Sequence, residues 1–293
     1  TQRRKKPATS TWDKVDVAGC DFETKDGFPW IMTWTYWNQD EEIWKDNAFV
    51  FGGTVNDREM FLQVNGGNQR PAFDISIFCQ KLYETGKYSQ GGWGKRRKPQ
   101  EMYFYNVSFD AGSIIKTLPT ESITRLMYGD TVMIDTKEWE STELVERVRV
   151  KNRRWVPGAP KHIKEYVLEW RVWNEGKTSH RKCPFNRYIQ VSYLPKKWLG
   201  LEPIMHYTNG EKWGKIDCWD IAPFCGSGGL NYQSKKLLGE SKIDFTKEEM
   251  NLLGSLTPEA VEFTLENWDK IFEYAIKDAN LTARLAWKQV SEF

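Results

Sequence analysis

The opening of the chain alternates between apolar and polar residues in a way that predicts strands. Residues 15–20 are mostly apolar and lead into Asp21-Phe22-Glu23, a pattern typical of a buried strand. The segment 31–37 alternates and is rich in β-branched and aromatic residues, which predicts a second strand in a hairpin with the first. Further strands are predicted at 49–51, 60–64, 102–105, 131–135 and 215–219.

Helical patterns follow these strands. Apolar residues recur at helical spacing in 70–83, and 109–118 and 230–238 are also predicted to be helical, with Gly239 as the stop of the latter. Thr257-Pro258-Glu259 predicts a further helix start, because it offers a capping hydroxyl, a proline in the first turn and an acid near the positive helix end. The order of elements predicts an α/β fold with a mixed β-sheet flanked by helices.

Three parts are predicted along the chain. Residues 1–13 form a basic N-terminal arm, residues 14–138 and 206–293 form the core, and residues 139–205 form an inserted, mostly β subdomain. The insertion is inferred from scattered β-like segments between polar and proline-containing loops. Basic clusters at 3–6, 95–98 and 151–154 are candidates for phosphate contact, although solvated loops have the same composition.

Composition bears on the partners and the cellular compartment of the protein more than on its reaction. The 293 residues carry a net charge of +2, so bulk charge does not argue for nucleic acid. No apolar run approaches the roughly 18 residues that span a bilayer, so no membrane partner is predicted. The five cysteines contain no CxxC pair and no regular framework, which indicates a reducing, intracellular compartment.

Candidate chemistry begins with two acids on the first strand. Asp21 and Glu23 are two residues apart, so their side chains project from the same face of a strand. Two neighbouring buried negative charges are costly unless a cation compensates them. The pair therefore suggests a metal site, with a strand end that reaches solvent as the alternative.

Two further acids are candidates for the same site. Asp110 follows a strand that ends in an Asn and then a Phe-Asp step, where it could hold a ligand or cap the following helix. Asp278 lies four residues after Tyr274, which puts both side chains on one helix face. The alternative for this second pair is a boundary Tyr beside an exposed Asp.

Together these segments resemble the three exonuclease motifs of the DEDD superfamily, in its tyrosine-bearing branch. Asp21-Phe22-Glu23-Thr24 resembles the first motif, residues 103–110 (YFYNVSFD) the second, and residues 274–278 (YAIKD) the third. The likeness is strongest to the 3′→5′ proofreading domain of family B DNA polymerases, especially the protein-primed kind. Residues 217–220, 230–239 and 242–245 (KIDF) are similar to the strand, helix and lysine-containing loop that precede the third motif there.

The resemblance implies an RNase H-like fold and phosphodiester hydrolysis with two Mg²⁺ or Mn²⁺ ions, which prefer oxygen ligands. It makes Asp21 the bridging ligand, with Glu23 and Asp278 completing one metal site and Asp110 helping to hold the other ion. Tyr274 is expected to orient the attacking water, because a phenol with a pKa near 10 is a poor base at neutral pH.

The resemblance also implies contacts to the substrate. A lysine near the scissile phosphate offsets developing charge, and its place in the KIDF segment makes Lys242 the first candidate and Lys247 the second. Thr24, Asn106 and Phe109 resemble the family's contacts to the terminal nucleotides, with Tyr103 and Tyr105 as weaker candidates. Stacking on Phe109 favours frayed single strands. The expected partners are single-stranded DNA or frayed duplex 3′ ends. The chain is expected to be either a free-standing exonuclease or one joined to a polymerase domain or subunit.

The expected activity is therefore 3′→5′ removal of nucleotides from DNA ends during replication or repair, with a cellular, viral or plasmid origin left open. An exoribonuclease of the same superfamily is an alternative, because the 2′-hydroxyl contacts that separate RNA from DNA are invisible in sequence. A non-catalytic nucleic-acid-binding domain is another. The departures from the family are the long segment 139–205 and the absence of polymerase motifs.

Overall fold

The computed structural model describes much of the predicted core. The described residues are 17–38, 41–51, 73, 75, 78–79, 100–135, 145–154, 163–173, 180–182, 188–203, 207–208, 211–212 and 216–291. The predicted basic arm, the predicted strand at 60–64 and most of the predicted helix at 70–83 lie outside these residues.

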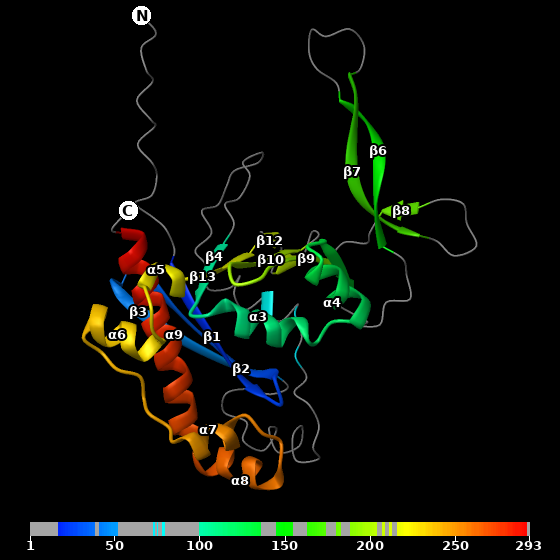
Figure 1. Ribbon diagram of the computed structural model, residues 1–293. Coiled ribbons are helices and arrows are strands. Elements are labelled where there is room, and N and C mark those ends of the chain that lie inside the picture. The colour runs from blue at the N-terminus through cyan, green and yellow to red at the C-terminus, as the bar shows by residue number, and fades with distance from the viewer. Residues whose placement is uncertain are drawn as a thin grey trace, which may run out of the picture.

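The described elements are strands in the first two thirds and helices mainly in the last third (Figure 1). The strands are β1 (Ala18–Lys25), β2 (Phe28–Asn38), β3 (Ile43–Val50), β4 (Gln100–Phe104), β5 (Val132–Asp135), β6 (Val145–Arg154), β7 (Ile163–Trp173), β8 (His180–Lys182), β9 (Tyr188–Leu194), β10 (Trp198–Pro203), β11 (Tyr207–Thr208), β12 (Glu211–Lys212) and β13 (Ile216–Asp220). The helices are α3 (Val107–Ile115), α4 (Thr120–Met127), α5 (Ala222–Cys225), α6 (Leu230–Leu238), α7 (Lys247–Leu253), α8 (Pro258–Glu266) and α9 (Trp268–Ser291).

Eight strands form one mixed sheet in the order β3-β2-β1-β4-β13-β10-β9-β5. β1, β2 and β3 are antiparallel, as the predicted hairpin requires. β4 then lies parallel to both β1 and β13, while β10, β9 and β5 continue antiparallel. The predicted α/β fold with a mixed sheet flanked by helices is confirmed.

Part of the predicted insertion belongs to this main sheet. β9 and β10 both fall within 139–205, yet β9 pairs with β5 and β10 pairs with β13. Ile189 and Val191 of β9 are fully buried in the same apolar cluster as Val132 and Ile134 of β5. β6, β7 and β8 pair with one another in a separate three-stranded sheet.

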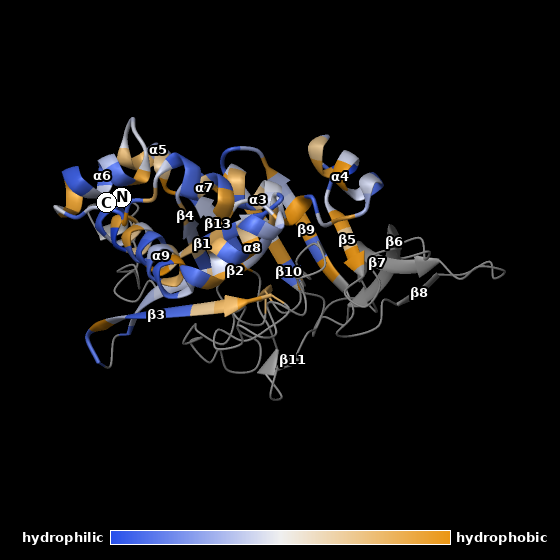
Figure 2. Cartoon of the chain, turned by 90° about the horizontal axis from the view of Figure 1, so that it is seen from below, coloured by the Kyte–Doolittle hydropathy of each residue, from blue (hydrophilic) through white to orange (hydrophobic). Residues whose placement is uncertain are grey.

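The two faces of β1 meet different helices. Cys20 and Phe22 point into the large apolar cluster that also contains Val107 and Ala111 of α3. The alternate residues, which begin with Gly19, face α9 on the other side of the sheet. Seen from below, α9 carries a mixture of hydrophobic and hydrophilic residues, while β5 is mostly hydrophobic (Figure 2). This arrangement is typical of an amphipathic helix on a sheet.

Gly19 allows α9 to lie unusually close to β1. A Cβ atom at this position would fall 2.2 Å from the backbone nitrogen of Ala283 and 2.4 Å from the carbonyl oxygen of Ala279. Both alanines are fully buried and add little bulk of their own. The helix backbone therefore rests directly on the strand, two residues before the first predicted ligand.

Among the helices of the described ranges, none combines the length and apolar character needed to cross a membrane.

Candidate active site

The first two predicted ligands, Asp21 and Glu23, lie on the face of β1 that meets α9. They alternate with Phe22, whose ring packs against Phe104 in the core with centroids 6.0 Å apart. Glu23 is only 8% exposed, whereas Asp21 is partly exposed. The pairing of β1 with β2 shifts register between Glu23 and Thr24, and such irregularities often re-aim side chains beside functional sites.

Asp110 approaches the same acids from α3. The pairing of β1 with β4 stops at Gly19 and Tyr103, so β1 continues past the end of β4. Beyond that point the backbone N–H of Phe22 donates a hydrogen bond to Asp110 Oδ1 at 3.2 Å. The helix N-cap is Asn106, so the alternative that Asp110 merely caps α3 is wrong.

Asn106 holds an unusual position at the start of α3. Its backbone is left-handed, with φ at 69°, and its exposed side chain makes no capping bond. Asp220, at the end of β13, instead accepts the N–H groups of Asn106 at 3.0 Å and of Ala222 at 2.9 Å, and also that of Val107. The strand residue thus caps the neighbouring helix and leaves the Asn106 amide turned to solvent.

Tyr274 and Asp278 reach the site from α9. They lie one turn apart, and both are buried, with Asp278 3% exposed and Tyr274 7% exposed. The alternative of an exposed acid beside a boundary tyrosine is therefore wrong. The Tyr274 hydroxyl hydrogen-bonds the Asp278 carboxylate, and the Tyr274 ring meets Phe245 edge-on with centroids 5.1 Å apart.

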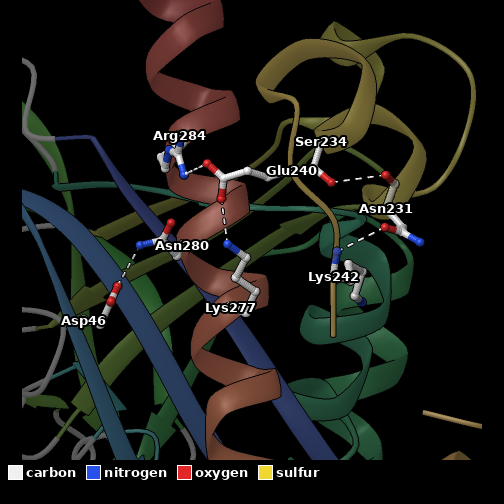
Figure 3. Close-up of polar contacts among 8 residues, drawn as sticks. All are labelled: Asp46, Asn231, Ser234, Glu240, Lys242, Lys277, Asn280 and Arg284. Atoms are coloured by element: carbon white, nitrogen blue, oxygen red, sulfur yellow. Dashed lines mark hydrogen bonds and ion pairs between the residues drawn. The ribbon is translucent and has the colours of Figure 1, made fainter. Parts of the chain in front are cut away.

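Lys242 completes the cluster from the segment between α6 and α7, which we call the strap (residues 240–246). Its ammonium forms an ion pair with the Asp278 carboxylate and donates to the Tyr274 hydroxyl at 3.3 Å. Its backbone N–H donates to Asn231 Oδ1 at 3.1 Å (Figure 3). Lys247, the second candidate, begins α7 with an exposed side chain.

The pKa values of the clustered acids are raised by burial and by the negative charge of their neighbours. Burial raises the pKa of Asp21 well above its usual range. Nearby negative charges raise it further, and they belong to Asp110, Glu23 and Asp278. Burial and then Asp278 raise the pKa of Glu23 to about 8. The Lys242 ammonium opposes both shifts, so it is the positive charge that these two carboxylates share.

The donor atoms fit hard divalent cations in kind. Carboxylate oxygens are the ligands that Mg²⁺ and Mn²⁺ prefer. Asp278 Oδ1 is buried without a hydrogen-bond partner, and such an atom calls for a cation or a donor. Within the described ranges, however, no group of three or more His, Cys, Asp or Glu side chains has the spacing of a ready-made metal site. The carboxylate oxygens would therefore have to move closer together when ions bind.

The predicted substrate contacts divide into two groups. Thr24 is partly exposed beside the β1 irregularity, and Phe109 is 59% exposed one residue before the buried Asp110. Tyr103 and Tyr105 instead pack against the apolar cluster beneath α5, α6 and α9. Their hydroxyls donate to Glu101 at 3.0 Å and to the Gly228 carbonyl at 2.6 Å, so these two side chains have structural partners.

Sequence reasoning missed several residues that hold this cluster in place. Lys25 is fully buried and donates to the carbonyls of Leu253 and Ser255 at 3.2 Å each and to the Thr264 hydroxyl at 2.9 Å. It ties the end of β1 to α7 and α8, and burial lowers its pKa to about 8. A lone lysine after Asp-x-Glu-x gives no sequence signal for this role, because the three groups that accept its hydrogen bonds lie more than 200 residues away.

Comparison with protein-family models, with curated proteins and with solved structures found no match for the chain.

Proposed function

We propose that the protein is a two-metal-dependent 3′→5′ exonuclease that removes nucleotides from single-stranded or frayed DNA ends. The observation that carries the proposal is one cluster of four acids that influence one another's charge, three of them buried, although the chain separates them by up to 257 residues. Asp21 and Glu23 come from β1, Asp110 from α3 and Asp278 from α9. Lys242 and Tyr274 contact Asp278 in the same cluster.

The strand order gives the proposal further support. Three antiparallel strands, β3, β2 and β1, are followed by β4 and β13, which run parallel to β1. This order is compatible with the RNase H-like fold that the motif resemblance implies. The first acids lie on the central strand β1, and Asp110 lies on the helix that follows the adjacent strand β4.

The acids are the groups to hold the cations. The charges of all three other carboxylates act on Asp21, so Asp21 would be one of the ligands together with them. Two bound Mg²⁺ or Mn²⁺ ions supply an activated water and stabilise the leaving oxygen of a phosphodiester. The chain supplies the fixed oxygens, and burial of Glu23, Asp110 and Asp278 excludes bulk water from around them.

Tyr274 and Lys242 have separate tasks in this proposal. Burial, reinforced by the nearby carboxylates, raises the pKa of Tyr274 far above its usual range, so the phenol keeps its proton at neutral pH. In the structure it hydrogen-bonds the Asp278 carboxylate, and we assign it the positioning of the attacking water beside that carboxylate. Lys242 reaches the acids from the strap, where its ammonium is placed to offset charge that develops on the phosphate.

The exposed residues near Asp110 suit contact with a strand end. Phe109 offers an exposed ring, and aromatic rings stack bases with little preference for sequence. Asn106 offers an exposed amide from a backbone position that Asp220 fixes. The four described cysteines are buried and form no disulfide, which is compatible with the reducing, intracellular setting expected for a replication or repair enzyme.

The test is degradation of an oligonucleotide labelled at its 5′ end, with Mg²⁺ present. We expect a ladder of products shortened from the 3′ end, and loss of at least about a hundredfold in rate for Asp21→Asn, since ions at such sites supply several kcal/mol. An Asp217→Asn variant is the matched control, because Asp217 is a buried acid bonded to Trp198 away from the cluster. Equal rates for Asp21→Asn and the parent contradict the proposal, and a marked preference for RNA over matched DNA transfers it to an exoribonuclease.

A further inference from the structure

The strap that carries Lys242 has no regular secondary structure of its own. It follows Gly239, which ends α6 in a left-handed conformation with φ at 74°, and it runs to Thr246, the N-cap of α7. A segment of this kind has no helix or strand ladder to hold its backbone. The position of the Lys242 ammonium beside Asp278 therefore depends on the contacts that fasten the strap to its surroundings.

Glu240 makes two of these contacts. Its Oε2 accepts from Lys277 Nζ at 2.6 Å and its Oε1 accepts from Arg284 Nη1 at 2.5 Å. The two cations lie seven residues apart on α9, which puts them on one face of the helix, and Figure 3 shows Glu240 pointing between them. Both carboxylate oxygens are thus engaged by one rigid element.

The register of this contact relates it to the candidate active site. Lys277 forms an ion pair with Glu240 of the strap. The next residue of α9, Asp278, forms an ion pair with Lys242 of the strap. The two interactions are thus made by neighbouring residues of α9 and by strap residues two apart. Asn231 of α6 fixes the backbone N–H of Lys242 itself (Figure 3). On the far side, the Phe245 ring packs on Tyr274.

We propose that Glu240 is a positioning residue that holds Lys242 at Asp278 by fastening the strap to α9. The inference rests on the proposed function for its effect on rate. Glu240 does not contact the acids of β1 or α3 in the described part of the chain. It acts through the backbone that it shares with Lys242, and its two cations lower its pKa, so the carboxylate is charged throughout the neutral range.

The exposure of Glu240 separates this role from a general stabilising one. The side chain is 33% exposed, and ion pairs at such sites contribute little to overall stability. Small displacements of a reacting group, in contrast, can lower a rate by up to about a hundredfold. Loss of the ion pairs between Glu240 and α9 should therefore lower the rate of cleavage far more than it lowers the melting temperature.

The experiment is a double-mutant cycle between Glu240→Gln and Lys242→Met, measured by steady-state cleavage of a single-stranded oligonucleotide at saturating Mg²⁺. We expect Glu240→Gln to lower kcat by roughly tenfold with KM within about twofold of the parent. In the Lys242→Met background the same change should have no further effect, because the group that it positions is gone. Glu249→Gln is the matched control, since Glu249 makes a comparable ion pair with Lys270 of α9 at 3.0 Å.

Two kinetic results overturn the inference. One is a Glu240→Gln variant that turns over at the parental rate. The other is an equal fold-loss in both backgrounds, which would mean that Glu240 acts through the fold in general. A crystal structure of Glu240→Gln tests the inference without an activity measurement. In that structure we expect the Lys242–Asp278 ion pair to be broken. An intact pair overturns the inference, whereas a parent protein without nuclease activity overturns the proposed function alone.

Discussion

The backbone of Ala283 lies where a side chain at Gly19 would have to be, with only 2.2 Å between its nitrogen and an added Cβ atom. This contact sets the distance between β1 and α9, the two elements that carry three of the four clustered acids. The Thr33 hydroxyl of β2 adds a second tie, since it donates to the carbonyl oxygen of Ala275 at 2.9 Å. The acids meet because a strand and a helix touch backbone to backbone beside them.

Gly19→Ala should disrupt this contact. The added methyl group meets helix backbone rather than a flexible side chain, so α9 has to shift, at a cost of about 1–3 kcal/mol of unfolding free energy. Cleavage should fall with it, because Asp278 moves away from Asp21. Gly112→Ala is the control: nothing lies within 4 Å of its added Cβ, and alanine favours a helix interior by about 1 kcal/mol. Chemical denaturation measures the unfolding free energy of both variants. Equal values for the two would show that close packing of β1 on α9 does not require a glycine at position 19.

Tyr274→Phe should slow cleavage and leave DNA binding almost unchanged. The Phe ring keeps the edge-on contact with Phe245 and the burial of the site, while the hydroxyl that we assign to the water is lost. We expect kcat to fall by roughly 10- to 100-fold. Single-turnover rates and fluorescence anisotropy with a labelled oligonucleotide measure the two effects separately. Indistinguishable cleavage rates would remove Tyr274 from the mechanism.

Stability in a chelator should fall as the pH rises through the neutral range. The folded-state pKa of Glu23 is about 8, above its usual value of 4.5, so between these limits the folded state binds more protons than the unfolded state. The contribution is fully present below about pH 4.5 and is lost as the pH approaches 8. The raised pKa values of Asp21 and Asp110 act in the same direction.

Glu23→Gln should flatten this dependence, because the amide does not titrate. Melting temperatures at intervals between pH 5 and pH 8, with a chelator present, give the slopes for the parent and the variant. A parent protein that gains stability over that range would show that the acids are not forced together. Added Mn²⁺ should raise the melting temperature at pH 8 in the parent, because a ligand bound by the folded state alone stabilises it.

Asp220→Ala should weaken the start of α3. Its carboxylate accepts N–H groups from Asn106 and Ala222, and the loss of a cap costs about 1 kcal/mol. We also expect a raised KM for DNA, since Asn106 loses its fixed backbone turn. Asp220→Asn keeps an acceptor oxygen and should retain most of the stability. A KM for Asp220→Ala equal to that of the parent would separate this cap from substrate binding.

Local patterns predicted much of the fold. Thr257 caps α8 through its hydroxyl, Gly239 ends α6 in a left-handed conformation, and the first two strands form an antiparallel hairpin. These features depend on residues that are close in sequence, so the sequence alone predicts them. The same is true of Asp21 and Glu23, whose shared face follows from strand alternation.

Features that depend on distant partners could not be predicted in the same way. β9 looked like part of an insertion, because its pairing with β5 joins residues more than 50 positions apart. Nothing local distinguishes Glu240 from a solvated acid, since Lys277 and Arg284 meet it only when α9 packs beside the strap. The pairing of Lys242 with Asp278 is visible only in three dimensions, although its segment resembled a known loop.

The most direct test of the central claim is anomalous diffraction from crystals soaked with Mn²⁺ and a short oligonucleotide. We predict two peaks about 4 Å apart beside Asp21, with the 3′ end of the strand at the same site. Crystals with ordered side chains but no Mn²⁺ among Asp21, Glu23, Asp110 and Asp278 would contradict it.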